Sequence, residues 1–143
     1  MENVYFDNSA TTRIDEEVLR EMMPFFKENY GNASSIYKLG RTSKKAIEES
    51  REKIAKAINA NPEDIYFTAG GSESDNTIIK GIAHFNKNKG NHIVTSKIEH
   101  PAVLETCKQL EQEGFEVTYI NVNNNGIIDL EELKKSITEN TIL

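Results

Sequence analysis

Apolar residues recur along this chain with two alternating periods. Segments in which they return every three or four positions are typical of amphipathic helices, and short runs rich in β-branched and aromatic residues are typical of strands. The pattern predicts helices over residues 16–30, 41–59, 72–86, 101–113 and 130–137, strands over 65–68, 92–96 and 115–122, and a short strand or extended arm at 4–6. Alternating strands and helices favour an α/β fold with a mostly parallel sheet, right-handed crossovers and helices on its faces.

Turn and capping residues set the expected boundaries of these elements. Asp15 is placed to cap the first helix, Pro24 is expected to kink or divide it, and Gly114 is expected to end the helix that begins at Pro101. The segment 31–35 reads as a loop and the segment 61–64 as a turn. Thr141-Ile142-Leu143 begins an apolar run of the kind that forms a buried strand, so we expect the sequence to be a truncated part of a larger domain.

Composition excludes several classes of protein. The chain has 143 residues, and its 17 basic and 23 acidic side chains give a net charge of −6 without a cationic stripe, which argues against nucleic-acid binding. No apolar stretch approaches the roughly 20 residues of a membrane helix, and the N-terminus has no secretory pattern. The single Cys107 fits a reducing compartment. We therefore expect a soluble cytoplasmic protein that binds neither nucleic acid nor membranes.

A pair of glycines, Gly70 and Gly71, joins a predicted strand to a predicted helix. Glycine allows a sharp turn and a close approach of a ligand, and the first N–H groups of a helix lack internal acceptors. With the hydroxyl of Ser72, these groups predict a seat for a phosphate ester. The alternative is an ordinary strand-to-helix turn in which Ser72 is the N-cap. Neither a Walker loop nor a GxGxxG dinucleotide motif is present at this turn.

His100 follows the predicted strand 92–96 and directly precedes Pro101. Ligands of parallel α/β sheets bind at the carboxyl ends of the strands, and a proline at the first helical position fixes the start of the helix. A histidine held there could stack on a planar cofactor and transfer protons. The alternative is an exposed histidine that caps the helix. His84 and His92 have no comparable setting, and we assign them structural roles.

The segment from Asn121 to Glu132 approximates a calcium-binding EF-hand loop. An EF-hand requires a helix before the loop, whereas residues 115–120 alternate like a strand, and Asn121 lacks the usual acidic charge of the first ligand position. An Asn-Gly turn followed by a capping box of Asp129 and Glu132 accounts for the same residues. We therefore favour the turn and predict no metal site.

Four blocks of sequence resemble NifS/IscS-like cysteine desulfurases of the class-V aminotransferase group, and the similarity extends over essentially the whole chain. They are Tyr5-Phe6-Asp7-Asn8-Ser9-Ala10-Thr11-Thr12, Gly31-Asn32-Ala33-Ser34-Ser35, Phe67-Thr68-Ala69-Gly70-Gly71-Ser72-Glu73-Ser74-Asp75-Asn76 and Ile98-Glu99-His100-Pro101-Ala102-Val103-Leu104-Glu105-Thr106. Ala33, Tyr37 and Ser72 replace a proline, a histidine and a threonine that are frequent in that family. Ser72 keeps the hydroxyl that phosphate binding requires.

The resemblance implies a pyridoxal-phosphate-dependent transferase of fold type I. Residues 1–14 would form an N-terminal arm near the active site, and residues 15–143 would form the N-terminal part of the large domain that binds the cofactor. Gly71 and Ser72 match the residues that bind the phosphate of pyridoxal 5'-phosphate. His100 matches the histidine that stacks on the pyridine ring and is implicated in proton transfer. The Schiff-base lysine and the catalytic cysteine of the family would lie beyond residue 143, and we expect Cys107 to be a buried or half-buried structural residue.

The activity implied by the resemblance is desulfuration of L-cysteine. The products would be L-alanine and an enzyme-bound persulfide, whose sulfur passes to iron–sulfur cluster assembly or to other acceptors. The implied partners are a second subunit in a homodimer and a sulfur-acceptor or scaffold protein. Residues 1–143 alone are expected to be inactive. Two alternatives stay open: a non-catalytic remnant that binds phosphate or pyridoxal phosphate, and another class-V enzyme such as a selenocysteine lyase.

Overall fold

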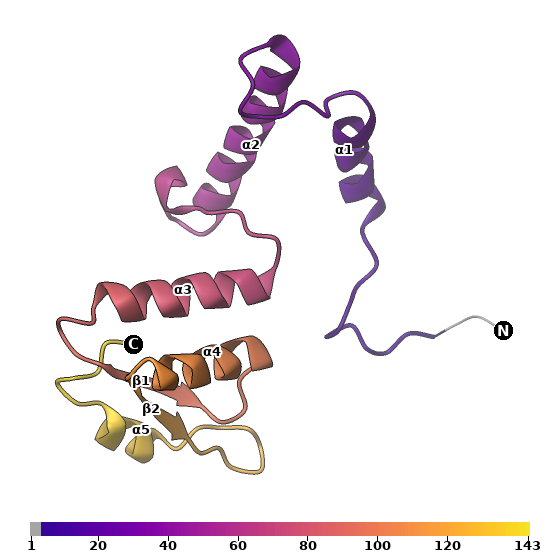
Figure 1. Ribbon diagram of the computed structural model, residues 1–143. Coiled ribbons are helices and arrows are strands. Elements are labelled where there is room, and N and C mark those ends of the chain that lie inside the picture. The colour runs from indigo at the N-terminus through magenta and orange to yellow at the C-terminus, as the bar shows by residue number, and fades with distance from the viewer. Residues whose placement is uncertain (1–3) are drawn as a thin grey trace. The chain divides into compact units, whose positions relative to one another are not determined.

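The computed structural model describes residues 4–143, which divide after Tyr66 into two compact units (Figure 1). The first unit contains α1 (Glu16–Lys27), α2 (Lys38–Ala57) and the 3-10 helix η1 (Pro62–Asp64). The second contains α3 (Gly71–Phe85), β1 (His92–Ser96), α4 (Pro101–Gln112), β2 (Glu116–Ile120) and α5 (Leu130–Ser136). No helix of these described residues is long and apolar enough to cross a membrane. Met1, from which the predicted N-terminal arm starts, lies outside the described residues, as do Glu2 and Asn3.

Helix α1 begins where the sequence predicts, because the Asp15 carboxylate accepts the N–H of Glu17 at 2.7 Å. Pro24 lies inside the helix and does not divide it, so that part of the prediction is wrong. A proline leaves one carbonyl of the preceding turn without its helical N–H. No residue of α1 is buried, so water can satisfy that carbonyl. The helix ends at Lys27 instead of residue 30. After Lys27, the N–H groups of Glu28 and Asn29 both donate to the Pro24 carbonyl at 2.8 Å.

The loop predicted at residues 31–35 is present and packs against the first turn of α2. Gly40 makes this approach possible, because a Cβ atom at that position would lie 2.5 Å from the Asn32 carbonyl oxygen and 2.6 Å from that of Ser35. The buried Ser43 adds a hydrogen bond from its hydroxyl to the Asn29 carbonyl at 2.9 Å. The Gly31–Ser35 block therefore has a packing role inside the first unit.

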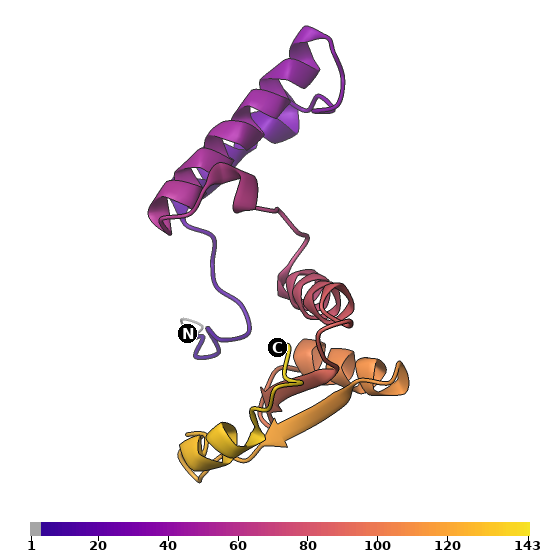
Figure 2. The ribbon, with the colours of Figure 1, turned by 90° about the vertical axis from the view of Figure 1, so that its left-hand side faces the viewer.

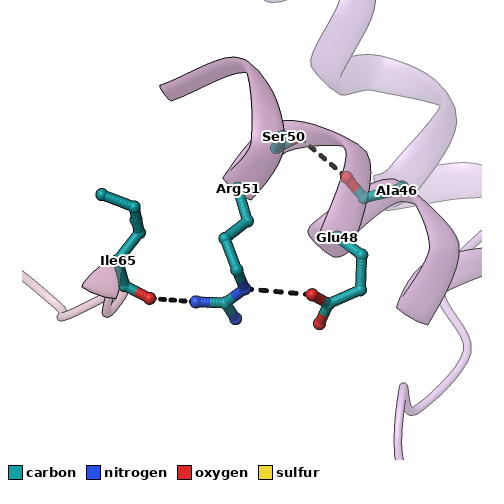
Figure 3. Close-up of polar contacts among 5 residues, drawn as sticks. All are labelled: Ala46, Glu48, Ser50, Arg51 and Ile65. Atoms are coloured by element: carbon teal, nitrogen blue, oxygen red, sulfur yellow. Dashed lines mark hydrogen bonds and ion pairs between the residues drawn. The ribbon is translucent and has the colours of Figure 1, made fainter. Parts of the chain in front are cut away.

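Arg51 of α2 holds the segment that follows η1 (Figure 3). Its Nε donates to the Glu48 carboxylate at 3.1 Å, and its guanidinium also donates to the Ile65 carbonyl. The strand predicted at residues 65–68 does not form. Ile65 has extended dihedral angles, φ −97° and ψ 122°, but residues 65–68 belong to none of the strands or β-bridges found within residues 4–143. An extended segment becomes a strand only when a neighbour accepts its hydrogen bonds, and Tyr66 is 83% exposed. Residues 4–6 are likewise an unpaired arm.

The second unit contains the parallel sheet that the sequence predicts. β1 and β2 pair in parallel from His92↔Glu116 to Ser96↔Ile120. On the other side of β1, Thr141 forms a parallel bridge with His92, and the N–H of Val94 donates to the Leu143 carbonyl at 2.9 Å. The predicted strand character of residues 141–143 is thus confirmed, and β1 lies between its two parallel neighbours.

Helices cover both faces of this sheet (Figures 1 and 2). The core lies between the sheet and the helices α3 and α4, and its buried members are Ala83, Ile93, Cys107, Leu110 and Phe115. α4 connects β1 to β2, and α5 leads back across β1 to residues 141–143. Figure 1 shows α4 and α5 on opposite faces of the sheet, which is the arrangement that right-handed crossovers running in opposite directions produce. Ligand sites of such sheets form at the carboxyl ends of the strands.

His92 links all three parallel segments through its imidazole. Its Nδ1 lies 2.8 Å from the Thr141 hydroxyl, and its Nε2 lies 2.8 Å from the Thr118 hydroxyl of β2. The side chain is buried, with 7% of the residue exposed. His84 is half-exposed, lies 3.2 Å from the Glu113 carboxylate and meets the Phe115 ring edge-on. Both histidines thus make contacts of the kind expected for structural residues.

Candidate functional site

The turn before α3 has a defined shape that its own side chains hold. The Thr68 hydroxyl lies 2.7 Å from the Ser74 hydroxyl and donates to the Gly70 carbonyl at 3.2 Å. The N–H of Ala69 donates to the Glu73 carboxylate at 2.6 Å. These contacts occupy the polar groups on either side of the glycine pair, and they engage the negative charge of Glu73 with a backbone donor.

The glycine pair itself faces open space. A Cβ atom built on Gly70 or on Gly71 would meet no atom within 4 Å. Gly70 is the N-cap of α3, and no side chain caps that helix, so the interpretation of Ser72 as the N-cap is wrong. Ser72 is instead the second residue of α3 and is exposed. The first N–H groups of the helix lack internal acceptors, and together with the Ser72 hydroxyl they form a set of donors that fits a phosphate ester.

His100 is the N-cap of α4, and its Nδ1 accepts the N–H of Ala102 at 3.1 Å. The alternative interpretation, an exposed histidine that caps the helix, is therefore confirmed, and Pro101 is the first helical residue. An atom that accepts an N–H carries no proton itself, so the proton of the neutral ring is on Nε2. The residue is exposed. Capping thus uses one ring nitrogen and leaves the ring faces and Nε2 available to a ligand.

Gly71 and His100 each begin a helix beside β1. α3 precedes β1 and α4 follows it, so the starts of both helices belong to the edge at which β1 ends. α3 and α4 also share the core on one face of the sheet. Among the described contacts, no hydrogen bond joins Ser72 to His100. The structure thus places the N–H donors of a helix start and an imidazole at this edge as two separate groups.

Two side-chain contacts in the turn before His100 were not predicted. The Ser96 hydroxyl donates to the Glu99 carboxylate at 2.8 Å, and Lys97 Nζ donates to the Asn121 side-chain oxygen at 2.7 Å. Sequence patterns do not reveal them, because Glu99 and Lys97 are exposed polar residues in a turn, where periodicity carries no signal. The first contact closes the turn before His100, and the second joins this turn to the residue that follows β2.

The segment from Asn121 to Glu132 is a hairpin-like turn, as favoured over an EF-hand loop. A strand, β2, precedes it, and Asn123 directs its side-chain oxygen to the N–H groups of Asn125 and Ile127 at 2.9 and 3.1 Å. Gly126 has φ +75°, which glycine tolerates. Within residues 4–143 no group of three or more His, Cys, Asp or Glu side chains could hold a metal ion.

The capping box predicted for α5 is half right. Asp129 accepts the N–H groups of Glu131 and Glu132 at 2.9 and 3.1 Å. The reciprocal contact is absent, because the Glu132 carboxylate accepts the backbone N–H and the side-chain amide of Asn121 at 3.1 and 2.9 Å. Asn121 offers two donors to one carboxylate, which is more than the single N–H of a capping box supplies.

Cys107 lies in α4 and is buried, with 1% of the residue exposed, as predicted. Burial raises the pKa of its thiol above the ordinary value of 9.0, and the carboxylates of Glu111 and Glu99 raise it further. A thiol with a raised pKa is a poor nucleophile because the thiolate is the reactive form. Cys107 therefore belongs to the core and takes no part in the candidate site.

Comparison with known protein families identifies the family to which this chain belongs. Residues 4–143 match the family described as "Aminotransferase class-V". The chain belongs to the class-V aminotransferases. The prediction made from the four sequence blocks is confirmed at this level, and so is the expectation of an α/β fold of this class.

Relatives within the class-V aminotransferases share a more specific name. The chain is 55% identical over 140 residues to cysteine desulfurase IscS of Clostridium botulinum, which covers 98% of this chain and 35% of that protein. It is 44% identical to a solved "NifS-like protein", with a TM-score of 0.93 and coverage of 98% of this chain and 38% of the other. A structure of "SspA in complex with cysteine" is 39% identical, with a TM-score of 0.88. The match covers 96% of this chain and 40% of the other. The chain thus spans about a third of the length of the curated relatives it matches.

Proposed function

We propose that the protein containing this chain is a pyridoxal-phosphate-dependent cysteine desulfurase that converts L-cysteine to L-alanine and transfers the sulfur as a persulfide. The 55% identity to IscS over 98% of the chain supports this activity more strongly than any other observation. The relative solved in complex with cysteine supports the substrate. We also propose that the sulfur serves iron–sulfur cluster assembly and other acceptors.

The turn at Gly70 and Gly71 is the proposed seat of the cofactor phosphate. The support is the open space in front of both glycines, the uncapped start of α3 and the exposed Ser72 hydroxyl. A phosphate there would accept hydrogen bonds from the first N–H groups of α3 and would lie at the positive end of the helix dipole. Gly71 and Ser72 would hold the phosphate, and Glu73 stays bound to the Ala69 N–H.

His100 is the proposed residue that contacts the cofactor ring. The residue is exposed, and its Nδ1 is already bound to the Ala102 N–H. The imidazole would therefore stack on the pyridine ring and hold a proton at Nε2, where it can take part in proton transfer. Bound pyridoxal phosphate supplies an electron-withdrawing ring that accepts the electrons released at the α-carbon of the substrate.

The remaining features of the protein are proposed from its relatives and from the single thiol. Residues 1–14 would form an arm near the active site, and residues 15–143 the N-terminal part of the large domain. We also propose that the protein forms a homodimer, that it binds a sulfur-acceptor or scaffold protein, and that it is located in the cytoplasm. A protein kept in that reducing compartment has no need of disulfides, and the chain has one buried cysteine.

The proposed activity is tested by incubating the purified protein with pyridoxal phosphate and L-cysteine and by measuring alanine and sulfide. We expect both products in the presence of a reductant, and we expect Ser72→Ala and His100→Ala to lower their rate of formation. Selenocysteine is the matched competing substrate. Release of alanine from selenocysteine with none from cysteine would reassign the protein to the selenocysteine lyases, and release from neither would overturn the proposal.

A further inference from the structure

The turn that carries His100 is closed by a hydrogen bond between the residues at its two ends. Ser96 is the last residue of β1 and is 9% exposed. Its hydroxyl donates to Oε1 of Glu99, the residue directly before His100, at 2.8 Å. An O–H donor that meets a carboxylate in a partly buried place makes one of the stronger side-chain hydrogen bonds. Glu99 therefore fixes the path of the chain immediately before His100.

A second contact reaches the same turn from the neighbouring strand. Lys97 Nζ donates to the Asn121 side-chain oxygen at 2.7 Å, and Asn121 is itself held by Glu132. Lys97 and Asn121 are both exposed, so water competes for this contact and its net contribution is small. The hydrogen bond between Ser96 and Glu99 is thus the stronger of these two side-chain contacts, which add to the backbone hydrogen bond from the Lys97 N–H to the Ile120 carbonyl at 3.0 Å.

The orientation of the His100 ring depends on that path. Its Nδ1 accepts the Ala102 N–H at 3.1 Å, while its backbone carbonyl accepts the N–H groups of Val103 at 2.9 Å and Leu104 at 3.2 Å. An N-cap side chain reaches its acceptor position only when the backbone of the cap residue has extended dihedral angles, here φ −59° and ψ 147°. A turn that is free to move loses this alignment and with it the selection of the Nε2–H form of the ring.

We propose that Glu99 is a positioning residue for His100, which it holds, through Ser96, with Nδ1 on the Ala102 amide and with Nε2–H exposed. The meaning of that orientation, an imidazole presented to a cofactor ring, rests on the proposed function. Glu99 itself contacts no ligand in this scheme. Its contribution is the selection of one ring orientation and one neutral tautomer.

The test uses the intact protein without pyridoxal phosphate and has two readouts at His100 itself. The first is the rate of hydrogen exchange at the Ala102 amide, and the second is the ¹⁵N chemical shifts of the His100 ring nitrogens, which distinguish the tautomers. Glu99→Ala is expected to speed exchange at Ala102 roughly tenfold, as a lost hydrogen bond to a charged group predicts, and to replace the Nε2–H signature by a mixture of tautomers. His100→Ala gives the exchange rate without any cap.

Matched variants separate positioning from a general loss of structure. Glu99→Gln keeps an oxygen acceptor for Ser96, so its exchange rate should stay within about threefold of the unaltered protein. Lys97→Met removes the exposed contact and should also stay within about threefold. Should Glu99→Ala fail to fold, Ser96→Ala and Ser96→Thr provide the same comparison from the donor side, because threonine retains the hydroxyl.

The outcomes distinguish this inference from the proposed function. Unchanged Ala102 exchange and an unchanged ring signature in Glu99→Ala would overturn the positioning role, whatever the protein catalyses. Equal effects of Glu99→Gln and Glu99→Ala would also overturn it. Failure of the unaltered protein to bind pyridoxal phosphate or to release alanine would overturn the proposed function alone, since both readouts at His100 are taken without the cofactor.

Discussion

The hydroxyl of Tyr119 on β2 donates to the Glu111 carboxylate on α4 at 3.2 Å, which joins a strand to the helix that covers it. Burial and the nearby negative charge of Glu111 raise the pKa of Tyr119 from 10.0 to about 12. The folded protein therefore keeps this phenol protonated at a pH where an unfolded chain would lose the proton. The stabilisation is complete below pH 10 and is lost as the pH rises from 10 to 12.

We predict that Glu111→Gln lowers the pKa of Tyr119 towards its ordinary value, because it removes the negative charge that opposes ionisation. The measurement is a spectrophotometric titration of tyrosinate, in which Tyr119 is the late component. Tyr119→Phe is the control and should delete that component. A late component that persists unchanged in Glu111→Gln would show that burial alone sets the shift.

Gly71 offers a way to separate folding from phosphate binding. Because a Cβ there meets no atom within 4 Å and Gly71 is the first helical residue, Gly71→Ala should fold normally and gain up to about 1 kcal/mol in unfolding free energy. The added methyl group projects into the space proposed for the phosphate, so affinity for pyridoxal phosphate should fall at least about tenfold. Chemical denaturation and cofactor titration measure the two effects.

Gly81→Ala is the matched control for this substitution. Gly81 lies in the middle of the same helix, and a Cβ there also meets no atom within 4 Å. It should show a similar gain in stability without a loss of cofactor affinity. Equal affinity in Gly71→Ala and Gly81→Ala would move the phosphate away from this turn.

Much of the fold follows from local sequence signals. The strand predicted at residues 92–96 has the same bounds as β1, and Gly114 ends the helix that starts at Pro101, with φ +92° at the glycine. Such signals act within a few residues, so their effect on local structure does not depend on the rest of the chain. The failed strand at 65–68 has the residue types of a strand, yet strand formation needs a partner that its own sequence does not supply.

The candidate site was only partly predictable for the same reason. The glycine pair and the His100–Pro101 step are short motifs with a direct backbone consequence, and the structure places each at the start of a helix. The Glu132 carboxylate could accept a hydrogen bond from Asp129 or from Asn121. Which of them it binds depends on the donors that a neighbouring strand brings within reach, and sequence spacing cannot decide that. The contact between Ser96 and Glu99 is likewise one of several that an exposed turn permits.

His92 should contribute more to stability than any other histidine of the chain. It is 7% exposed and bridges the hydroxyls of Thr118 and Thr141, so His92→Leu leaves the Thr118 hydroxyl without this partner and leaves Thr141 only its contacts with Thr138. We expect a loss of about 2–3 kcal/mol in unfolding free energy, measured by chemical denaturation.

His84→Gln is the comparison for His92, since His84 is half-exposed and its carboxylate neighbour Glu113 is accessible to water. Exposed pairs of this kind contribute less than about 1 kcal/mol. If both variants lost the same free energy of unfolding, the hydrogen bonds of His92 to Thr118 and Thr141 would contribute no more to stability than the exposed pair of His84.

Cys107 should be unreactive in the folded protein, although the proposed reaction passes sulfur to a cysteine. The thiol is 1% exposed in the core, and burial followed by the Glu111 and Glu99 carboxylates raises its pKa. Alkylation by iodoacetamide, followed by mass spectrometry of the peptide that contains Cys107, should be at least about a hundredfold slower in native protein than in denaturant. Cys107→Ala should retain the rate of alanine release while it lowers stability by about 1–2 kcal/mol, because it removes a small buried side chain. Rapid alkylation of native Cys107, or loss of alanine release without loss of stability, would instead place this thiol in the sulfur-transfer chemistry.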